Sequence, residues 1–147
     1  MQIFQATASQ IDDLAFLLNQ YRIFYRQDSD FDAGKKFIQE RFKQQDSIIF
    51  LATVADKPVG YTQLFPSWST VSMKRVWILN DLFVLPEARK QGIAKALMNA
   101  AKDYAISTQA VRIILATEAT NTTAQNLYES MGYSKFDEFY HYILAIA

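Results

Sequence analysis

The chain has 147 residues, half of them hydrophobic, with 15 basic and 15 acidic side chains and no formal net charge at pH 7. This length indicates a single domain over residues 1–147, and a neutral chain has no overall field to draw in nucleic acid or an anionic membrane. No cysteine and one histidine, His141, exclude disulfides, a cysteine nucleophile and multi-histidine metal sites. Because no secretory signal and no run of about twenty apolar residues is visible, we expect a cytoplasmic protein.

The first half of the chain predicts a strand, two helices and three further strands. Ser9 and Asp12 resemble a capping box, and apolar residues at helical spacing then continue to about Phe24. A second helix is expected around residues 37–42. The strands of this half are predicted at residues 3–6, 47–55, 59–65 and 76–84. Pro66 is expected to break the third of them.

The second half of the chain changes to helix, strand, helix and two closing strands. Asn121 is expected to cap the second of these helices and Gly132 to end it. The elements are predicted at residues 92–106, 111–117, 121–131, 133–137 and 139–146. The whole order, β-αα-βββ-α-β-α-ββ, predicts an α/β fold with a mixed, mostly antiparallel central sheet of about seven strands flanked by four helices.

The strongest chemical signal is the loop Arg89-Lys90-Gln91-Gly92-Ile93-Ala94, which follows a strand and opens a helix. Free backbone N–H groups and the helix dipole make such a helix start an anion site. Gly92 permits close approach of a ligand, and Arg89 and Lys90 can add charge-assisted bonds to a pyrophosphate. Taken alone, the same hexad also fits an ordinary strand-to-helix loop with solvated charges.

Three segments in this order resemble the GCN5-related N-acetyltransferase (GNAT) superfamily. They are Ile78-Leu79-Asn80-Asp81-Leu82-Phe83-Val84, then Arg89 to Ala94, then Asn121-x-x-Ala124-x-x-Leu127-Tyr128-x-x-x-Gly132-Tyr133. The resemblance covers essentially all 147 residues in element order. Residues 79–84 look most like the polyamine and Hpa2-like branches.

The resemblance implies a binding site for the co-substrate acetyl-CoA. In that family, the loop binds the pyrophosphate through backbone amides, here those of Gln91, Gly92, Ile93, Ala94 and Lys95, with Arg89 and Lys90 beside it. The preceding strand pairs with the pantetheine arm, here through the backbone of Leu82, Phe83 and Val84. The amide near Leu82 would act as an oxyanion donor, and Asn121 would contact the arm.

The resemblance also implies the catalytic groups. Tyr128 corresponds to the tyrosine that protonates the departing thiolate, although without the family it is most simply a core aromatic residue. Asp81 and Glu118 are the candidate bases, since Asn80 stands where several relatives have glutamate and cannot accept a proton. The alternatives are that Asp81 bonds backbone at a bulge, that Glu118 is a solvated strand end, or that water accepts the proton.

The implied reaction is N-acetyl transfer to a primary amine by direct attack in a ternary complex, without a metal. The acceptor is expected to be a small amine, a polyamine or an amino acid. A protein or peptide N-acetyltransferase and a non-catalytic acetyl-CoA-binding regulator stay open as alternatives. No nucleic-acid or membrane partner is expected, and the aromatic C-terminal strands are candidates for pairing two copies into a homodimer.

Overall fold

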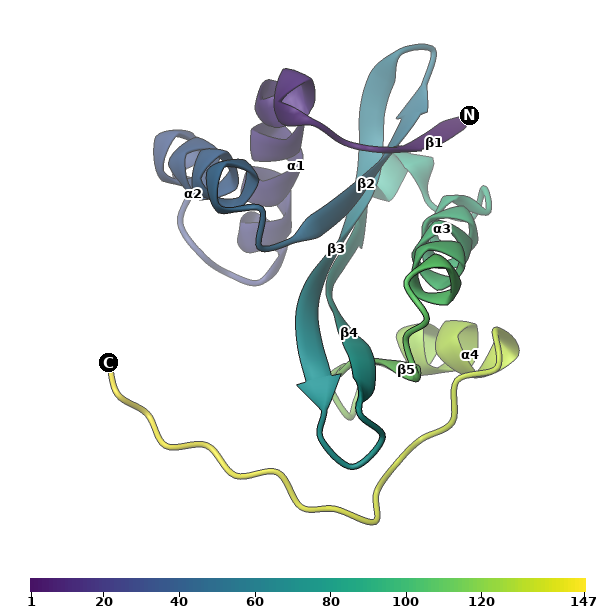
Figure 1. Ribbon diagram of the computed structural model, residues 1–147. Coiled ribbons are helices and arrows are strands. Elements are labelled where there is room, and N and C mark those ends of the chain that lie inside the picture. The colour runs from purple at the N-terminus through teal and green to yellow at the C-terminus, as the bar shows by residue number, and fades with distance from the viewer. The chain divides into compact units, whose positions relative to one another are not determined.

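The computed structural model describes residues 1–147 in two compact units, Met1–Ala116 and Thr117–Ala147. The first unit holds one sheet, whose strands are β1 (Gln2–Gln5), β2 (Ile48–Val54), β3 (Lys57–Ser69), β4 (Lys74–Val84) and β5 (Arg112–Ile114). Its helices are α1 (Ile11–Phe24), α2 (Phe31–Gln44) and α3 (Ile93–Ser107), and the second unit holds α4 (Thr122–Ser130). In Figure 1, α1 and α2 cover one face of the sheet and α3 covers the other.

The sheet is mixed, as the sequence predicts. Its strands follow the order β1-β2-β3-β4-β5, with antiparallel neighbours except for the parallel pair β4 and β5. Four helices are confirmed, but the sheet has five strands rather than about seven. Residues 133–137 and 139–146 are not strands, because beyond Tyr133 the chain makes no backbone hydrogen bond. Their aromatic and β-branched composition favours a strand only where a partner strand exists.

Strand β3 continues through Pro66, so the predicted strand break is wrong. Pro66 pairs with Trp77 of β4, whereas the partner strand on the other side, β2, ends its pairing at the Ile48–Leu64 pair. Beyond Leu64 this side of β3 is therefore a free edge. A proline lacks an N–H group and is tolerated at such an edge, because no ladder bond is lost there.

Helices α1, α3 and α4 follow the predicted bounds closely, whereas α2 (Phe31–Gln44) extends well beyond the predicted residues 37–42, and the predicted first cap is wrong. The capping box is formed by Thr7 and Gln10 at a 3-10 turn (Ala8–Gln10) that precedes α1, and not by Ser9 and Asp12. Asn121 caps α4 as predicted, since its Oδ1 accepts the Ala124 N–H at 3.1 Å. No helix in the chain is both long enough and apolar enough to cross a membrane.

The core of the first unit lies on both faces of the sheet. Its fully buried helical side chains are Leu14, Ala15 and Leu17 from α1, Ile38 from α2, and Leu97, Met98 and Ala101 from α3. Gly60 of β3 allows β4 and α3 to approach closely, because a Cβ there would lie 2.8 Å from the Phe83 carbonyl oxygen of β4 and 3.4 Å from Leu97 of α3. This packing fixes the start of α3 beside the end of β4.

Candidate functional site

The loop between β4 and α3 exposes a row of free backbone donors. A short 3-10 turn (Pro86–Ala88) follows β4, and α3 then begins after Gly92, which provides no side-chain cap. Six consecutive N–H groups, from Lys90 to Lys95, have no hydrogen-bond partner in the chain, and the first intrahelical bond is donated by Ala96 to the Gly92 carbonyl. Donors gathered at the positive end of a helix dipole form an anion site.

The backbone of this loop contains two left-handed residues, a feature that anion-binding nests share. Lys90 and Gly92 both have positive φ, at 62° and 79°, and alternation of left- and right-handed residues turns successive N–H groups toward one concave side. A Cβ added at Gly92 would meet no atom within 4 Å. The space in front of Gly92 is therefore open to a ligand.

A bulge in β4 reorganises the strand that leads into the loop. Gln63 of β3 pairs with Asp81, but its neighbour Leu64 pairs with Leu79, so Asn80 is the extra residue. Trp77 lies on the α3 side, where its ring meets Tyr104 at 5.3 Å, whereas Phe83 meets Tyr21 of α1 at 5.6 Å. Residues 77 and 83 would share a face in a regular strand. The bulge thus turns Asp81 and Phe83 to the α1 side.

One edge of β4 has no partner strand beyond the bulge. Strand β5 pairs only with Val76 to Ile78, so β4 beyond Leu79 has β3 on one side and no strand on the other. The Leu85 N–H bonds Val59 of β3, and the Val84 carbonyl instead accepts from the Arg89 side chain. Since backbone direction alternates along a strand, Leu82 and Val84 face the open edge and Phe83 faces β3.

Asp81 is the buried carboxyl of this site, with 4% of its surface exposed. Its Oδ2 accepts hydrogen bonds from the Tyr61 hydroxyl at 3.0 Å and from Gln63 Nε2 at 2.9 Å. Its Oδ1 accepts from Asn80 Nδ2, the bulge residue beside it. Its own carbonyl accepts from the Thr62 hydroxyl at 2.7 Å. Asn80 therefore holds the carboxyl in place, although it cannot itself accept a proton.

Burial and hydrogen bonding shift the pKa of Asp81 in opposite directions. Burial raises the pKa of Asp81 and is the largest effect, while the hydrogen bonds from Asn80, Gln63 and Tyr61 lower it, leaving the pKa above its ordinary value of 3.8. Burial and the neighbouring carboxylate together raise the pKa of Tyr61 well above 10.0, so this tyrosine remains a hydroxyl donor. A carboxylate with a raised pKa is a stronger proton acceptor than an ordinary surface carboxylate.

Aromatic side chains from α1 surround this part of the sheet. Tyr21 meets Tyr61 edge-on at 6.0 Å, and Phe24 lies 6.2 Å from Phe83. The Arg89 guanidinium lies over both phenylalanine rings, 5.2 Å from Phe24 and 5.9 Å from Phe83, while its Nε donates to the Val84 carbonyl at 3.0 Å. Arg89 thus links the loop to the aromatic cluster at the end of the open edge.

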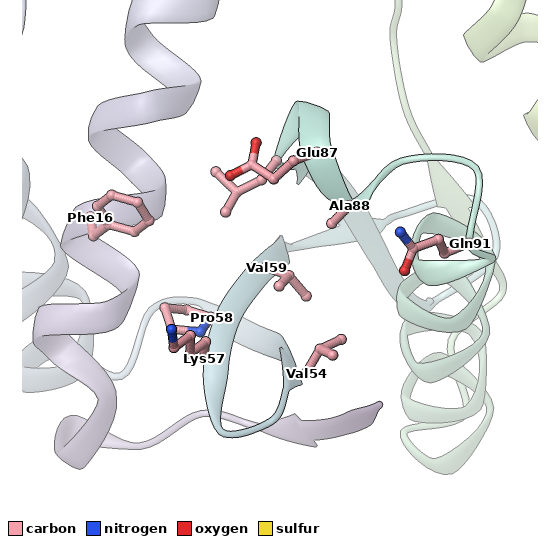
Figure 2. Close-up of a pocket in the computed structure, with 9 residues that line it drawn as sticks. Phe16, Val54, Lys57, Pro58, Val59, Glu87, Ala88 and Gln91 are labelled. Atoms are coloured by element: carbon pink, nitrogen blue, oxygen red, sulfur yellow. The ribbon is translucent and has the colours of Figure 1, made fainter.

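A cavity of about 450 Å³ borders the same loop on another side (Figure 2). Phe16 of α1, the β2–β3 hairpin and the start of the loop enclose it, and most of its lining is apolar. Lys57 and Glu87 are its charged side chains and they oppose each other in sign. The cavity therefore lacks the excess of positive charge that phosphates require, and the anion-binding feature of this region is the row of backbone N–H groups.

The remaining residues selected from the sequence lie in the second unit. The Glu118 carbonyl accepts the Asn121 N–H at 3.0 Å in the turn before α4. Tyr128 lies on α4 with its ring 6.2 Å from that of Tyr133. The structure thus brings Asp81, Leu82, Phe83, Val84 and the loop residues together in the first unit, whereas Glu118, Asn121 and Tyr128 belong to the second unit.

Two side chains of the site, Tyr61 and Gln63, were not selected by the sequence analysis. Both lie in a β3 segment that reads as an ordinary buried strand. Their importance depends on the β3–β4 register, in which they face Phe83 and Asp81. A glutamine in the middle of a strand, between Thr62 and Leu64, is the one sequence signal that could have drawn attention to this segment.

Comparisons with a family model, with related sequences and with solved structures all identify acetyltransferases. The model of the acetyltransferase (GNAT) family matches residues 11–133. The chain is 45% identical over 146 residues to "Uncharacterized N-acetyltransferase YhfO" of Bacillus subtilis (strain 168), which covers 99% of this chain and 98% of that protein. It also resembles the crystal structure of a probable acetyltransferase with a TM-score of 0.94, at 42% identity and with 100% and 99% of the two chains covered.

A more distant structure shares the fold and contains a ligand. AAC(6')-Iy, solved in complex with the bisubstrate analogue CoA-S-monomethyl-acetylneamine, matches with a TM-score of 0.83 at 20% identity, over 98% of this chain and 97% of that chain. At this identity the likeness shows the fold alone.

Proposed function

Because this chain belongs to the acetyltransferase (GNAT) family, we propose that it transfers the acetyl group of acetyl-CoA to a primary amine, by direct attack in a ternary complex. The observation that supports this most is the row of six free N–H groups from Lys90 to Lys95, next to the open edge of β4. A pyrophosphate needs donors of this kind, and an extended pantetheine arm needs an unpaired strand edge. Both features therefore fit acetyl-CoA.

In this proposal the coenzyme lies along the loop and the strand. The amides of Gln91 to Lys95 hold the pyrophosphate, assisted by Arg89 and Lys90. The backbone of Leu82 and Val84 faces the arm, and the amide near Leu82 stabilises the negative charge that develops on the thioester oxygen. Phe83 would contribute through its ring rather than its backbone, since its N–H and carbonyl face β3. In the second unit, Asn121 would contact the arm.

The chemical step requires one proton acceptor and one proton donor. The amine nitrogen attacks the acetyl carbon, the carbon–sulfur bond breaks, the amine proton passes to a base and the thiolate receives a proton. Asp81 is the proposed base, because it is buried, hydrogen-bonded and turned to the α1 side by the bulge. Glu118 is the second candidate, and Tyr128 is the proposed donor to the thiolate.

The acceptor we propose is a small primary amine, a polyamine or an amino acid. Asp81 is almost fully buried among neutral donors and aromatic rings, so the group that reaches it must be slender. An amine at the end of a flexible chain meets this condition. A lysine of a protein or peptide also meets it, and this acceptor class is the alternative that the experiment below separates.

The regulator alternative is weakened by the contacts of Asn80. The replacement of a family glutamate by Asn80 leaves Asp81 as the only carboxyl at the bulge, and Asn80 donates a hydrogen bond to that carboxyl. A chain that merely bound acetyl-CoA would not need a buried carboxylate held by three donors beside the open edge. We therefore favour an enzyme.

We further propose that both units act as one cytoplasmic acetyltransferase domain that pairs as a homodimer. The family match over residues 11–133 spans both units, which supports one domain. Large exposed apolar side chains between Phe136 and Ile146 are a candidate surface for pairing two copies.

The experiment that tests the function is release of the CoA thiol from acetyl-CoA, measured against polyamines, amino acids, small amines and lysine peptides. We expect release with one acceptor class, lowered by Tyr128→Phe and by Asp81→Asn. Tyr133→Phe is the matched control, because it removes the neighbouring hydroxyl of the same unit and leaves Tyr128 in place. Binding of acetyl-CoA without release by any acceptor would instead support the regulator.

A further inference from the structure

Strand β3 contributes two side chains to the carboxyl site that the reaction described above does not use. Tyr61 and Gln63 lie on the α1 side of the sheet, opposite Phe83 and Asp81 in the β3–β4 register. Both donate to the same oxygen, Oδ2 of Asp81, at 3.0 and 2.9 Å. Two donors on one oxygen fix the orientation of the carboxyl group, and they lower the energy of its ionised form.

The carboxamide of Gln63 is also incompletely paired. Its Nε2 is committed to Asp81, but its Oε1 is buried without a hydrogen-bond partner, and the whole residue is 1% exposed. A buried acceptor without a donor is unfavourable, and native proteins rarely keep one without a reason. Since Oε1 and Nε2 share one carbon, the unpaired oxygen belongs to the same carboxamide that binds the Asp81 carboxylate. It marks a place where an O–H or N–H donor is missing from the network.

We propose that Tyr61 and Gln63 are positioning residues for the proton transfer to Asp81. Their two donors hold Oδ2 ionised and correctly oriented, and Gln63 Oε1 receives the hydrogen bond of the group that delivers the proton, which is the acceptor amine or a water molecule in front of it. The protonated amine loses one proton, the carboxylate gains it, and the neutral nitrogen is then free to attack. This inference rests on the proposed role of Asp81 as the base.

The surroundings of Asp81 make its protonation depend on these neutral donors. Asn80 of its own strand binds the other oxygen, and Tyr21 of α1 touches the Tyr61 ring edge-on. The Arg89 guanidinium lies over Phe83 and bonds the Val84 carbonyl, and neither of the two salt bridges in the chain involves Asp81. No ion pair therefore offsets the burial that raises the pKa of Asp81, and loss of one donor must raise it further.

The test combines a direct titration with a rate profile. The carboxyl carbon of Asp81 is titrated by ¹³C NMR, and kcat/KM for acetyl transfer is measured against pH in the same variants. Tyr61→Phe removes one oxygen and keeps the ring against Tyr21. We expect the midpoint of Asp81 and the acid limb of the profile to move upward together by about one pH unit, since a hydrogen bond to a charged group is equivalent to roughly a tenfold change in the ionisation constant.

Gln63→Leu separates the two roles of the carboxamide. It should shift the midpoint of Asp81 in the same direction, and kcat/KM should also stay about tenfold low at a pH where Asp81 is ionised, because the acceptor for the incoming donor is gone. The loss in Tyr61→Phe should shrink at that pH. Tyr104→Phe is the control, because its ring contacts Phe50 and Trp77 on the α3 side and it should move neither measurement.

The two measurements also separate the possible failures. Variants that lower the rate without moving the Asp81 midpoint would overturn the positioning role. A shifted midpoint that the rate profile does not follow would overturn it too, by removing Asp81 from the proton transfer while leaving acetyl transfer intact. Absence of turnover in the unaltered protein would instead overturn the proposed function. If Gln63→Leu does not fold, Tyr61→Phe alone tests the positioning role. This variant removes only the hydroxyl oxygen of Tyr61 and should therefore fold.

Discussion

Gly92 allows the anion-binding role of the loop to be separated from its backbone geometry. Its φ of 79° is unfavourable for any residue with a Cβ, yet a Cβ there would meet no atom within 4 Å. Gly92→Ala should therefore lower the free energy of unfolding by about 1 kcal/mol, from backbone strain alone. For a chain of this size, that corresponds to a fall in Tm of roughly 3 °C.

The effect of Gly92→Ala on acetyl-CoA binding should be much larger. The new methyl group would occupy the open space in front of the free N–H groups, where the pyrophosphate is proposed to lie. Loss of one charge-assisted hydrogen bond, at about 1.5–3 kcal/mol, predicts an increase of about 10- to 100-fold in Kd, and loss of two predicts about 100- to 10,000-fold. Isothermal titration calorimetry with acetyl-CoA measures this directly.

Gly132 provides the matched control for Gly92. Its φ is 92° and a Cβ there would also meet no atom within 4 Å, so Gly132→Ala carries a similar backbone strain. We expect a similar loss of stability in the two variants, with weaker acetyl-CoA binding only in Gly92→Ala. Acetyl-pantetheine, which lacks the pyrophosphate, should bind both variants equally. An unchanged Kd for acetyl-CoA in folded Gly92→Ala would refute the anion site.

Three further predictions concern stability and the open edge. Asp81→Asn should lower transfer and remove one source of the pH dependence of stability. The folded pKa of Asp81 lies above the unfolded value near 3.8, so the folded state binds more protons and stability falls as pH rises through that window; unfolding experiments at several pH values should show that the variant lacks this slope. Arg89→Met should weaken acetyl-CoA binding about tenfold in calorimetry, with Arg89→Lys intermediate because it keeps the charge without the planar stacking. Leu97→Ala, at a fully buried position of α3, should cost about 2–5 kcal/mol in urea unfolding, whereas exposed Ile106→Ala on the same helix should change stability by about 0.5 kcal/mol or less.

The parts of the fold that sequence reasoning predicts well are those with local causes. Asn121 caps α4 through its own side chain, and Gly132 has the positive φ expected just after that helix. The hairpin between β2 and β3 is local too, with Ala55 and Asp56, both at positive φ, as its turn residues. Each of these features depends on contacts within a few residues, which the sequence displays directly.

The features that sequence reasoning misses depend on partners far along the chain. Pro66 stays in β3 because β2 ends earlier, and strand 111–117 shortens to Arg112–Ile114 because only three of its residues pair with β4. The C-terminal residues have strand composition but no strand beside them. Strand propensity indicates only that a residue tolerates a strand conformation. Whether it forms a strand depends on a neighbouring strand with which its backbone can pair.

The residues of the candidate site also fall into those with local sequence signals and those that depend on distant partners. Gly92 and its neighbours were found because a strand, a glycine and a helix follow one another in sequence. Asp81 was found because a carboxylate is unusual in an apolar strand. Tyr61 and Gln63 lie about twenty residues away, and only the antiparallel register with its bulge brings them to the Asp81 carboxyl.

The unpaired edge of β4 has a consequence for the protein in the absence of its co-substrate. An exposed strand edge accepts any extended peptide, so the edge proposed to receive the pantetheine arm is also a template for self-association. Two features of this chain limit that hazard: the bulge at Asn80 interrupts the regular spacing of donors and acceptors, and the Arg89 side chain occupies the Val84 carbonyl and places a positive charge at the end of the edge. A pantetheine arm bound along this edge would compete with other protein chains for the same unpaired backbone N–H and carbonyl groups of β4. Acetyl-CoA should then act as a protectant against aggregation, and the protein should remain soluble longest when it is saturated with it.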